Sequence, residues 1–111
     1  MNKQKFIDYI ISLKAEDFGF YLQSRYKQRT LMSSAFSIIT LELIGGLNAI
    51  DKNKESSHIL FSQDPNTGMF IDPASQELQK HYSDLESNYI HYQTTAFSLS
   101  SLDALGTQPE Y

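Results

Sequence analysis

Two groups of side chains along the chain have the types and spacing to do chemistry. The first is a basic group that precedes an apolar stretch: Arg25, Lys27 and Arg29. The second combines phenol, imidazole and amide groups: Tyr89, His91, Tyr92 and Gln93. A phenol beside an imidazole can act as an acid and base pair, and aromatic and amide side chains suit a sugar or another polyol. The candidate ligand-binding set is therefore Arg29, Tyr89, His91, Tyr92 and Gln93, with no catalytic residue assigned.

A second interpretation of the later group is purely structural. Adjacent residues on a helix point in different directions, so Tyr89 and Tyr92 can be half-buried packing residues whose hydroxyls reach solvent, with His91 merely exposed. Both interpretations need the same element, a helix across this part of the chain. The sequence leaves open whether the segment binds a ligand or only packs.

Metal and cofactor chemistry find little support in the sequence. The segment 64–75 has oxygen-bearing residues spaced as in a calcium loop, but Met69 stands where a glycine is needed and Ser75 where a glutamate is needed. The three histidines include no pair four residues apart, and the chain has no cysteine. No glycine-rich nucleotide motif is present either. We therefore expect no metal and no cofactor.

Composition limits the class of protein. The 111 residues carry nine basic and thirteen acidic side chains, a net charge of −4. This balance argues against nucleic-acid binding, which needs a basic field. With 41% hydrophobic residues and no cysteine, the chain has the composition of one small globular domain without disulfides.

One stretch, residues 31–50, is long enough to span a bilayer and carries a single charge, Glu42. A carboxylate at the centre of a membrane helix costs about 2.5–3.5 kcal/mol on insertion scales, and Gly45 and Gly46 weaken the far end. A helix buried by protein explains the same composition without that cost. Because Asp8 and Lys14 also interrupt any secretory signal, we expect a cytoplasmic protein that does not cross a membrane.

The elements that must position these residues are predicted to be helices. Apolar residues recur at helical spacing in several segments, and glycines mark their ends. We expect the first helix to end near Gly19, the central one at Gly45 and the last one at Gly106. Residues 20–27 and 51–56 are expected to be connections. The helical segments are residues 6–13, 30–47, 57–63, 72–81 and 83–105.

An internal repeat is the most informative pattern in the chain. Residues 33–45 align without gaps to residues 94–106, with five of thirteen positions identical and six more closely similar. The two halves, residues 3–50 and 56–107, then each contain a short helix, a glycine turn, a connection and a long helix rich in small residues. The sequence predicts one domain that arose by duplication of this unit.

The apolar helix that enters the turn at residues 63–70, together with the small-residue helix at residues 92–106, resembles the repeat of the α/α toroids. This superfamily includes terpenoid cyclases, the β-subunits of protein prenyltransferases and related polysaccharide lyases. The resemblance covers most of the chain and implies an all-α fold of two repeated helical hairpins. It also implies inner helices at residues 33–44 and 94–105, and outer helices at residues 6–13 and 57–63.

The same resemblance bears on function. A toroid needs more than two hairpins to close, and stacked repeats generally need three or more units to bury a continuous core. The acidic cluster of the cyclases and the zinc ligands of the prenyltransferases have no counterpart here. We therefore expect a partial or non-catalytic module for assembly or ligand binding, which associates with itself or with a larger protein. Two alternatives stay open: a toroid-type enzyme acting on a polysaccharide or an isoprenoid, and a helical interaction domain in which the repeat is coincidental.

Overall fold

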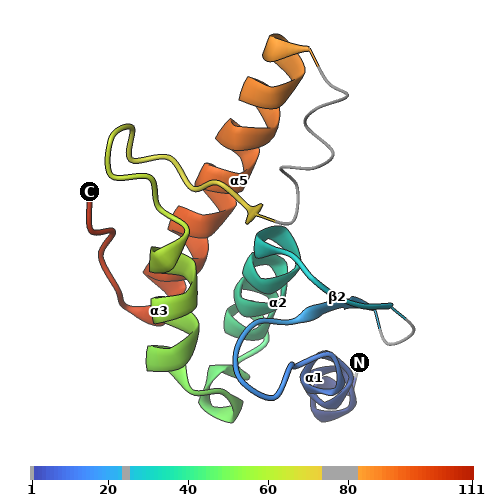
Figure 1. Cartoon of the computed structure of the whole chain (residues 1–111). Coiled ribbons are helices and arrows are strands. Elements are labelled where there is room, and N and C mark those ends of the chain that lie inside the picture. Colours follow the sequence, from blue (N-terminus) through green and yellow to red (C-terminus); the bar gives the residue numbers. More distant parts are fainter. Residues whose placement is uncertain (1, 24–25, 74–82) are drawn as a thin grey trace.

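The computed structural model describes residues 2–23, 26–73 and 83–111 and is mainly helical (Figure 1). The all-α prediction holds for most of the chain but misses a small two-stranded sheet. The helices are α1 (Lys3–Ser12), α2 (Leu31–Leu43), α3 (Lys52–Phe61) and α5 (Asp84–Leu105). A 3-10 turn, η1 (Leu47–Ala49), follows α2, and the sheet consists of β1 (Tyr21–Gln23) and β2 (Tyr26–Arg29).

Helices α2 and α5 form the centre of the molecule. They lie side by side and run in the same direction, from top to bottom in Figure 1. Helix α1 packs against α2, and α3 packs against α5. The core lies between these helices and the turns that join them, and its buried hydrophobic residues are Ile10, Leu13, Phe20, Leu31, Ile38, Leu41, Ile59, Phe70, Leu102 and Leu105.

The two shorter helices begin earlier than the sequence predicted. Asn2 caps α1 by accepting the N–H of Lys5 at 3.1 Å, and Asp51 caps α3 by accepting the N–H groups of Asn53 and Lys54. A cap of this kind satisfies backbone donors that a helix start leaves unpaired. The charged segment 51–56, expected to be a connection, is therefore the cap and first half of α3.

Each of the two shorter helices leads into a turn that folds back on the end of the helix. An isolated bridge joins Lys14 to Phe20 in the first turn and Gln63 to Phe70 in the second. Within these turns Gly19 has a φ of +79° and Gly68 a φ of +77°, a conformation that glycine adopts without steric cost. Helix α1 thus ends at Ser12, and the first turn, rather than the helix, reaches the glycine expected at its end.

Residues 20–27, predicted to be a connection, contribute to an antiparallel hairpin instead. Tyr21 of β1 pairs with Arg29 of β2. Helix α2 begins directly after β2, where Thr30 accepts the N–H of Ser33 and Ser33 Oγ accepts the N–H of Thr30 in return. This reciprocal cap fixes the start of α2 one residue after the predicted position.

The ends of the two long helices follow the glycines. Helix α2 is followed by Gly45 with a φ of +77°, and α5 ends at Leu105, directly before Gly106 with a φ of +75°. The predicted end of α5 is confirmed, whereas α2 ends four residues before the predicted Leu47. Beyond Pro73, the helix expected over residues 72–81 lies outside the described residues. In the described part of the chain, every helix is too short or too polar to traverse a bilayer.

Candidate functional site

Helices α2 and α5 pack against each other, and an aromatic pair lies across their contact. Ser98 and Ser101 of α5 are fully buried, and Ser101 Oγ donates to the carbonyl of Ser98 at 2.8 Å. The rings of Phe36 on α2 and Phe97 on α5 lie 4.6 Å apart between centroids. Small side chains let two helices approach closely, and the tilted ring pair adds a specific contact. This interface therefore has a defined register.

Hydroxyl groups on the two long helices hold the two turns in place. The N–H of Phe20 donates to Ser34 Oγ at 3.0 Å, and the N–H of Phe70 donates to Thr95 Oγ1 at 2.9 Å. The two acceptors are 61 residues apart in the sequence. Because both phenylalanines are fully buried, each hydroxyl satisfies a backbone donor that water does not reach.

Residues of α2 and α5 that are 61 positions apart in the sequence match each other in the internal repeat. Along one side of the two helices, these matching residues differ sharply in exposure. On α2 this stripe is buried: Leu31, Ala35 and Ile38. The residues 61 positions later on α5 are exposed, and we name them the open stripe: Tyr92, Ala96 and Leu99. Leu31 is 2% exposed against 63% for Tyr92, and Ile38 is 0% exposed against 40% for Leu99. The same kind of surface is covered on one helix and bare on the other.

A second stripe shows the opposite difference. On α5 it is buried: Ser98, Ser101 and Leu105. The matching residues of α2 are only half-buried, and we name them the rear stripe: Ser37, Thr40 and Ile44. Each helix thus has one buried stripe and one less buried stripe, and the position that is buried on α2 is the one that is exposed on α5.

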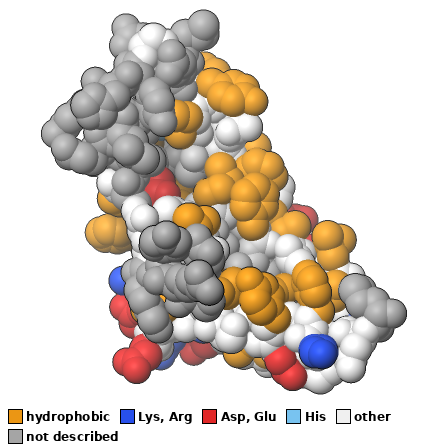
Figure 2. Space-filling view, turned by 90° about the vertical axis from the view of Figure 1, so that its right-hand side faces the viewer, with side chains coloured by type: hydrophobic (Ala, Val, Ile, Leu, Met, Phe, Trp, Pro, Cys, Tyr) orange, Lys and Arg blue, Asp and Glu red, His pale blue; other side chains and the backbone are white. Residues whose placement is uncertain are grey.

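The side of the molecule in Figure 2 carries a band of exposed hydrophobic side chains.

The residues of the predicted ligand-binding set fall in two places. Tyr89 and Tyr92 are exposed on α5, where Gln93 Nε2 donates to the Tyr89 hydroxyl at 3.1 Å. His91 is half-buried on the same helix. Arg29 lies instead at the end of β2, beside a groove whose lining contains none of these α5 residues.

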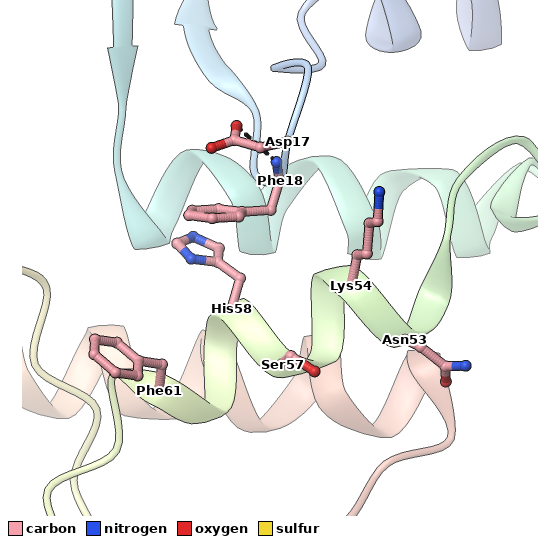
Figure 3. Close-up of a pocket in the computed structure, with 7 residues that line it drawn as sticks. All are labelled: Asp17, Phe18, Asn53, Lys54, Ser57, His58 and Phe61. Carbon is pink, nitrogen blue, oxygen red and sulfur yellow. Dashed lines mark hydrogen bonds between the residues drawn. The ribbon is translucent and has the colours of Figure 1, made fainter.

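That groove lies between the first turn and α3 (Figure 3). It contains a cavity of about 630 Å³ lined by Asp17, Phe18, Asn53, Lys54, Ser57, His58 and Phe61. A second cavity of about 290 Å³ shares Phe18, His58 and Phe61 and extends to Arg29 and Asp72. We name the two together the aromatic groove.

A buried ion pair holds the turn against α3 beneath the groove. Glu55 is fully buried, its Oε1 lies 2.8 Å from Lys14 Nζ, and its Oε2 accepts the N–H of Gly19 at 2.9 Å. A buried carboxylate is tolerated only when such partners replace water. Lys14 Nζ also donates to the carbonyl of Ala15 at 2.8 Å, which fixes its position.

The walls of the aromatic groove are stacked rings. The Phe18 and His58 rings lie 4.3 Å apart between centroids, and the Arg29 guanidinium lies 4.6 Å from the centre of the Phe18 ring. Arg29 also pairs with Asp17. Burial lowers the pKa of His58 below its ordinary value, although the nearby Glu55 acts to raise it. Burial thus favours the neutral form of the His58 imidazole.

Two features of the aromatic groove suit a ligand. His58 Nε2 is buried and has no hydrogen-bond partner among the described residues, and Phe61 is 89% exposed at the rim. Neither residue belongs to the predicted ligand-binding set, although both lie in the segment 57–63 that the sequence predicted to be helical. Their spacing of three, which places them on one side of a helix, was the signal available.

Comparisons with protein-family models, with curated proteins and with solved structures return no match to this chain. Within residues 2–23, 26–73 and 83–111, no three histidine or acidic side chains are grouped as metal ligands would be. The site must therefore be interpreted from its own geometry.

Proposed function

We propose that the chain is a helical assembly module made of two copies of one helix–turn–helix unit, residues 3–50 and 56–107. Several pairs of features support the duplication. The first helix of each unit is ten residues long and is capped by an Asn or Asp side chain. Each of these helices leads into a turn that contains a glycine with a positive φ, Gly19 or Gly68. Each long helix is likewise followed by a glycine with a positive φ, Gly45 or Gly106.

The open stripe carries the proposal. The stripe of α2 is buried in the folded chain, whereas the matching stripe of α5 is exposed. A further unit packed in the same way would cover Tyr92, Ala96 and Leu99. Removing apolar surface from water contributes about 25 cal/mol per Å², so a leucine and a tyrosine supply a useful driving force. The unit is therefore complete only when another protein surface covers α5.

The resemblance to α/α toroids supports the same function. In that fold, units of this kind pack around a ring with one helix of each unit inside and one outside. By analogy, α2 and α5 would be the inner helices, and α1 and α3 the outer ones. Two units make only part of such a ring, which is the physical reason to expect association with further units.

Sedimentation equilibrium over a range of concentrations tests this proposal. We expect the average mass of the wild-type chain to rise with concentration and the Leu99→Lys variant to remain monomeric. Leu43→Lys is the matched control, because Leu43 is 80% exposed on α2 but belongs to neither stripe. A wild-type chain that stays monomeric up to millimolar concentration would refute the function.

The aromatic groove favours a second candidate function, the binding of a sugar or another polyol. An exposed ring such as that of Phe61 can pack against the C–H face of a sugar, and Asn53 and Ser57 provide hydrogen-bonding groups at the rim. His58 Nε2 offers an acceptor to a hydroxyl of the ligand. Heteronuclear NMR titration with neutral and acidic hexasaccharides should shift the resonances of α3, and Phe61→Ala should abolish the shifts. Unchanged spectra with every sugar would refute this function.

A further inference from the structure

We propose that the partner of the open stripe is a second copy of this chain, bound head to tail. The rear stripe of one copy (Ser37, Thr40 and Ile44 of α2) then packs against the open stripe of the next (Tyr92, Ala96 and Leu99 of α5). This inference rests on the proposed assembly function and names its partner. It follows from the contact that the chain already makes between its own halves.

The residue types of the two stripes repeat the internal interface. The stripe of α5 that is buried in the chain consists of Ser98, Ser101 and Leu105, and the rear stripe presents Ser, Thr and Ile at the matching positions. Both stripes begin with two small hydroxyl residues, which permit another helix to approach closely. Both end with a branched apolar residue, Ile44 in the rear stripe and Leu105 in the buried stripe of α5. The rear stripe can therefore take the place of the buried stripe of α5.

The other side of the contact repeats in the same way. The stripe of α2 that is buried in the chain consists of a large apolar residue, an alanine and a branched apolar residue. The open stripe has Tyr92, Ala96 and Leu99 in that order. Each copy consequently carries an open stripe and a rear stripe on two different surfaces. The rear stripe of a second copy therefore fits the open stripe of the first.

The phenylalanine pair gives the register of the contact. Phe36 packs on Phe97 within the chain, yet Phe36 is still 47% exposed. Phe97 of one copy would meet Phe36 of the next and continue the row of rings. Aromatic pairs at this spacing add about 0.5–1.5 kcal/mol beyond the area they bury.

The turns agree with this arrangement. Within the chain, Gly19 donates its N–H to Glu55 of the neighbouring unit. In a head-to-tail assembly, the residue of the next copy that matches Glu55 is Phe6, which cannot accept a hydrogen bond. The second turn does not need it, because the N–H of Gly68 donates to the carbonyl of Asp64 at 2.7 Å. The amide of Gly68 is therefore already paired within the chain.

A head-to-tail contact uses two different surfaces, so it differs from the self-complementary contact of a two-fold dimer. Such contacts build a closed ring when the rotation between copies divides a full circle, and an open filament otherwise. Each copy has one free stripe of each kind, and blocking one kind leaves the other intact. This property allows a complementation test.

The test uses two variants that block one stripe each, Leu99→Lys on the open stripe and Ser37→Lys on the rear stripe. We expect each purified variant to sediment as a monomer, and an equimolar mixture to form a dimer and nothing larger. The doubly substituted chain should not associate with either single variant. Leu43→Lys serves as the control and should assemble as the wild type does. Circular dichroism melts check folding, and Ala96→Lys replaces Leu99→Lys if the latter is unfolded.

The outcomes separate the inference from the function on which it rests. A mixture that stays monomeric, or a single variant that dimerises by itself, overturns the head-to-tail contact while the wild-type chain still assembles. A wild-type chain that does not associate at any concentration overturns the assembly function as well. A dimer that forms only in the mixture supports both.

Discussion

Replacing Lys14 by methionine should strongly destabilise the protein, because it leaves a charge buried without its partner. Glu55 is fully buried, and its two carboxylate oxygens contact only Lys14 Nζ at 2.8 Å and the N–H of Gly19 at 2.9 Å among the described residues. Methionine keeps most of the apolar length of lysine. The variant therefore removes the countercharge together with the hydrogen bond from Lys14 Nζ to the carbonyl of Ala15.

The magnitude follows from the burial of the pair. Breaking a buried ion pair by removing one partner costs about 3–5 kcal/mol. The Lys14 side chain is 19% exposed, so water screens part of this effect, and we expect a loss at the lower end, about 3 kcal/mol. For a domain of this size, that loss lowers the melting temperature by roughly 10–15 °C. Adding Glu55→Gln should recover more than half of the loss, because the amide oxygen still accepts from Gly19.

Urea denaturation followed by circular dichroism measures these free energies of unfolding. Lys5→Met, on the exposed face of α1, is the control and should change stability by less than about 0.5 kcal/mol. If Lys14→Met proves as stable as this control, the buried charge is not held by Lys14. If Glu55→Gln fails to restore stability, the cost lies in packing rather than charge. Either result would refute the reasoning.

Three further predictions concern single positions. Burial lowers the pKa of His58, so the unfolded chain binds more protons than the folded chain below pH 6.5, and the stability of the wild type should fall as the pH is lowered through that value. Urea melts at a series of pH values should show this fall in stability. The His58→Phe variant, which keeps a ring in the stack, should not show the part of the fall that His58 causes. Gly45→Ala and Gly46→Ala should each cost about 1–2 kcal/mol, the first through its φ of +77° and the second because a Cβ would lie 3.0 Å from both Ile7 Cγ1 and Leu41 Cδ2. Thermal melts should show that adding Ile7→Ala, which removes Cγ1 and Cδ1, lowers the cost of Gly46→Ala but not that of Gly45→Ala. Thr95→Val should cost about 1–3 kcal/mol by orphaning a backbone N–H of the second turn, and faster hydrogen exchange of that amide should accompany it.

Features that depend on neighbouring residues along the chain could be predicted from the sequence. Gly45 and Gly106 mark the ends of the long helices, since a positive φ is a local property of the backbone. The central apolar helix and the last helix were both expected, and both are present. The aligned segments 33–45 and 94–106 also identified the two helices that pack together at the centre.

Features that depend on distant partners could not be predicted. The segments β1 and β2 lack the alternating pattern of a strand, and their pairing with each other forms the sheet. Helix α3 begins at a charged segment that looks like a connection, because burial of Glu55 depends on Lys14, 41 residues earlier. The aromatic groove likewise joins Phe18 to His58 from separate elements.

The sequence by itself determined which glycines follow the long helices, which segments match and which residue types each stripe carries. Only the tertiary structure decided which of the matching stripes is covered. Ile38 and Leu99 occupy matching positions and are chemically alike, yet one is fully buried and the other is 40% exposed. The difference arises because burial depends on what packs against a side chain, and matching residues of α2 and α5 have different neighbours in the folded chain.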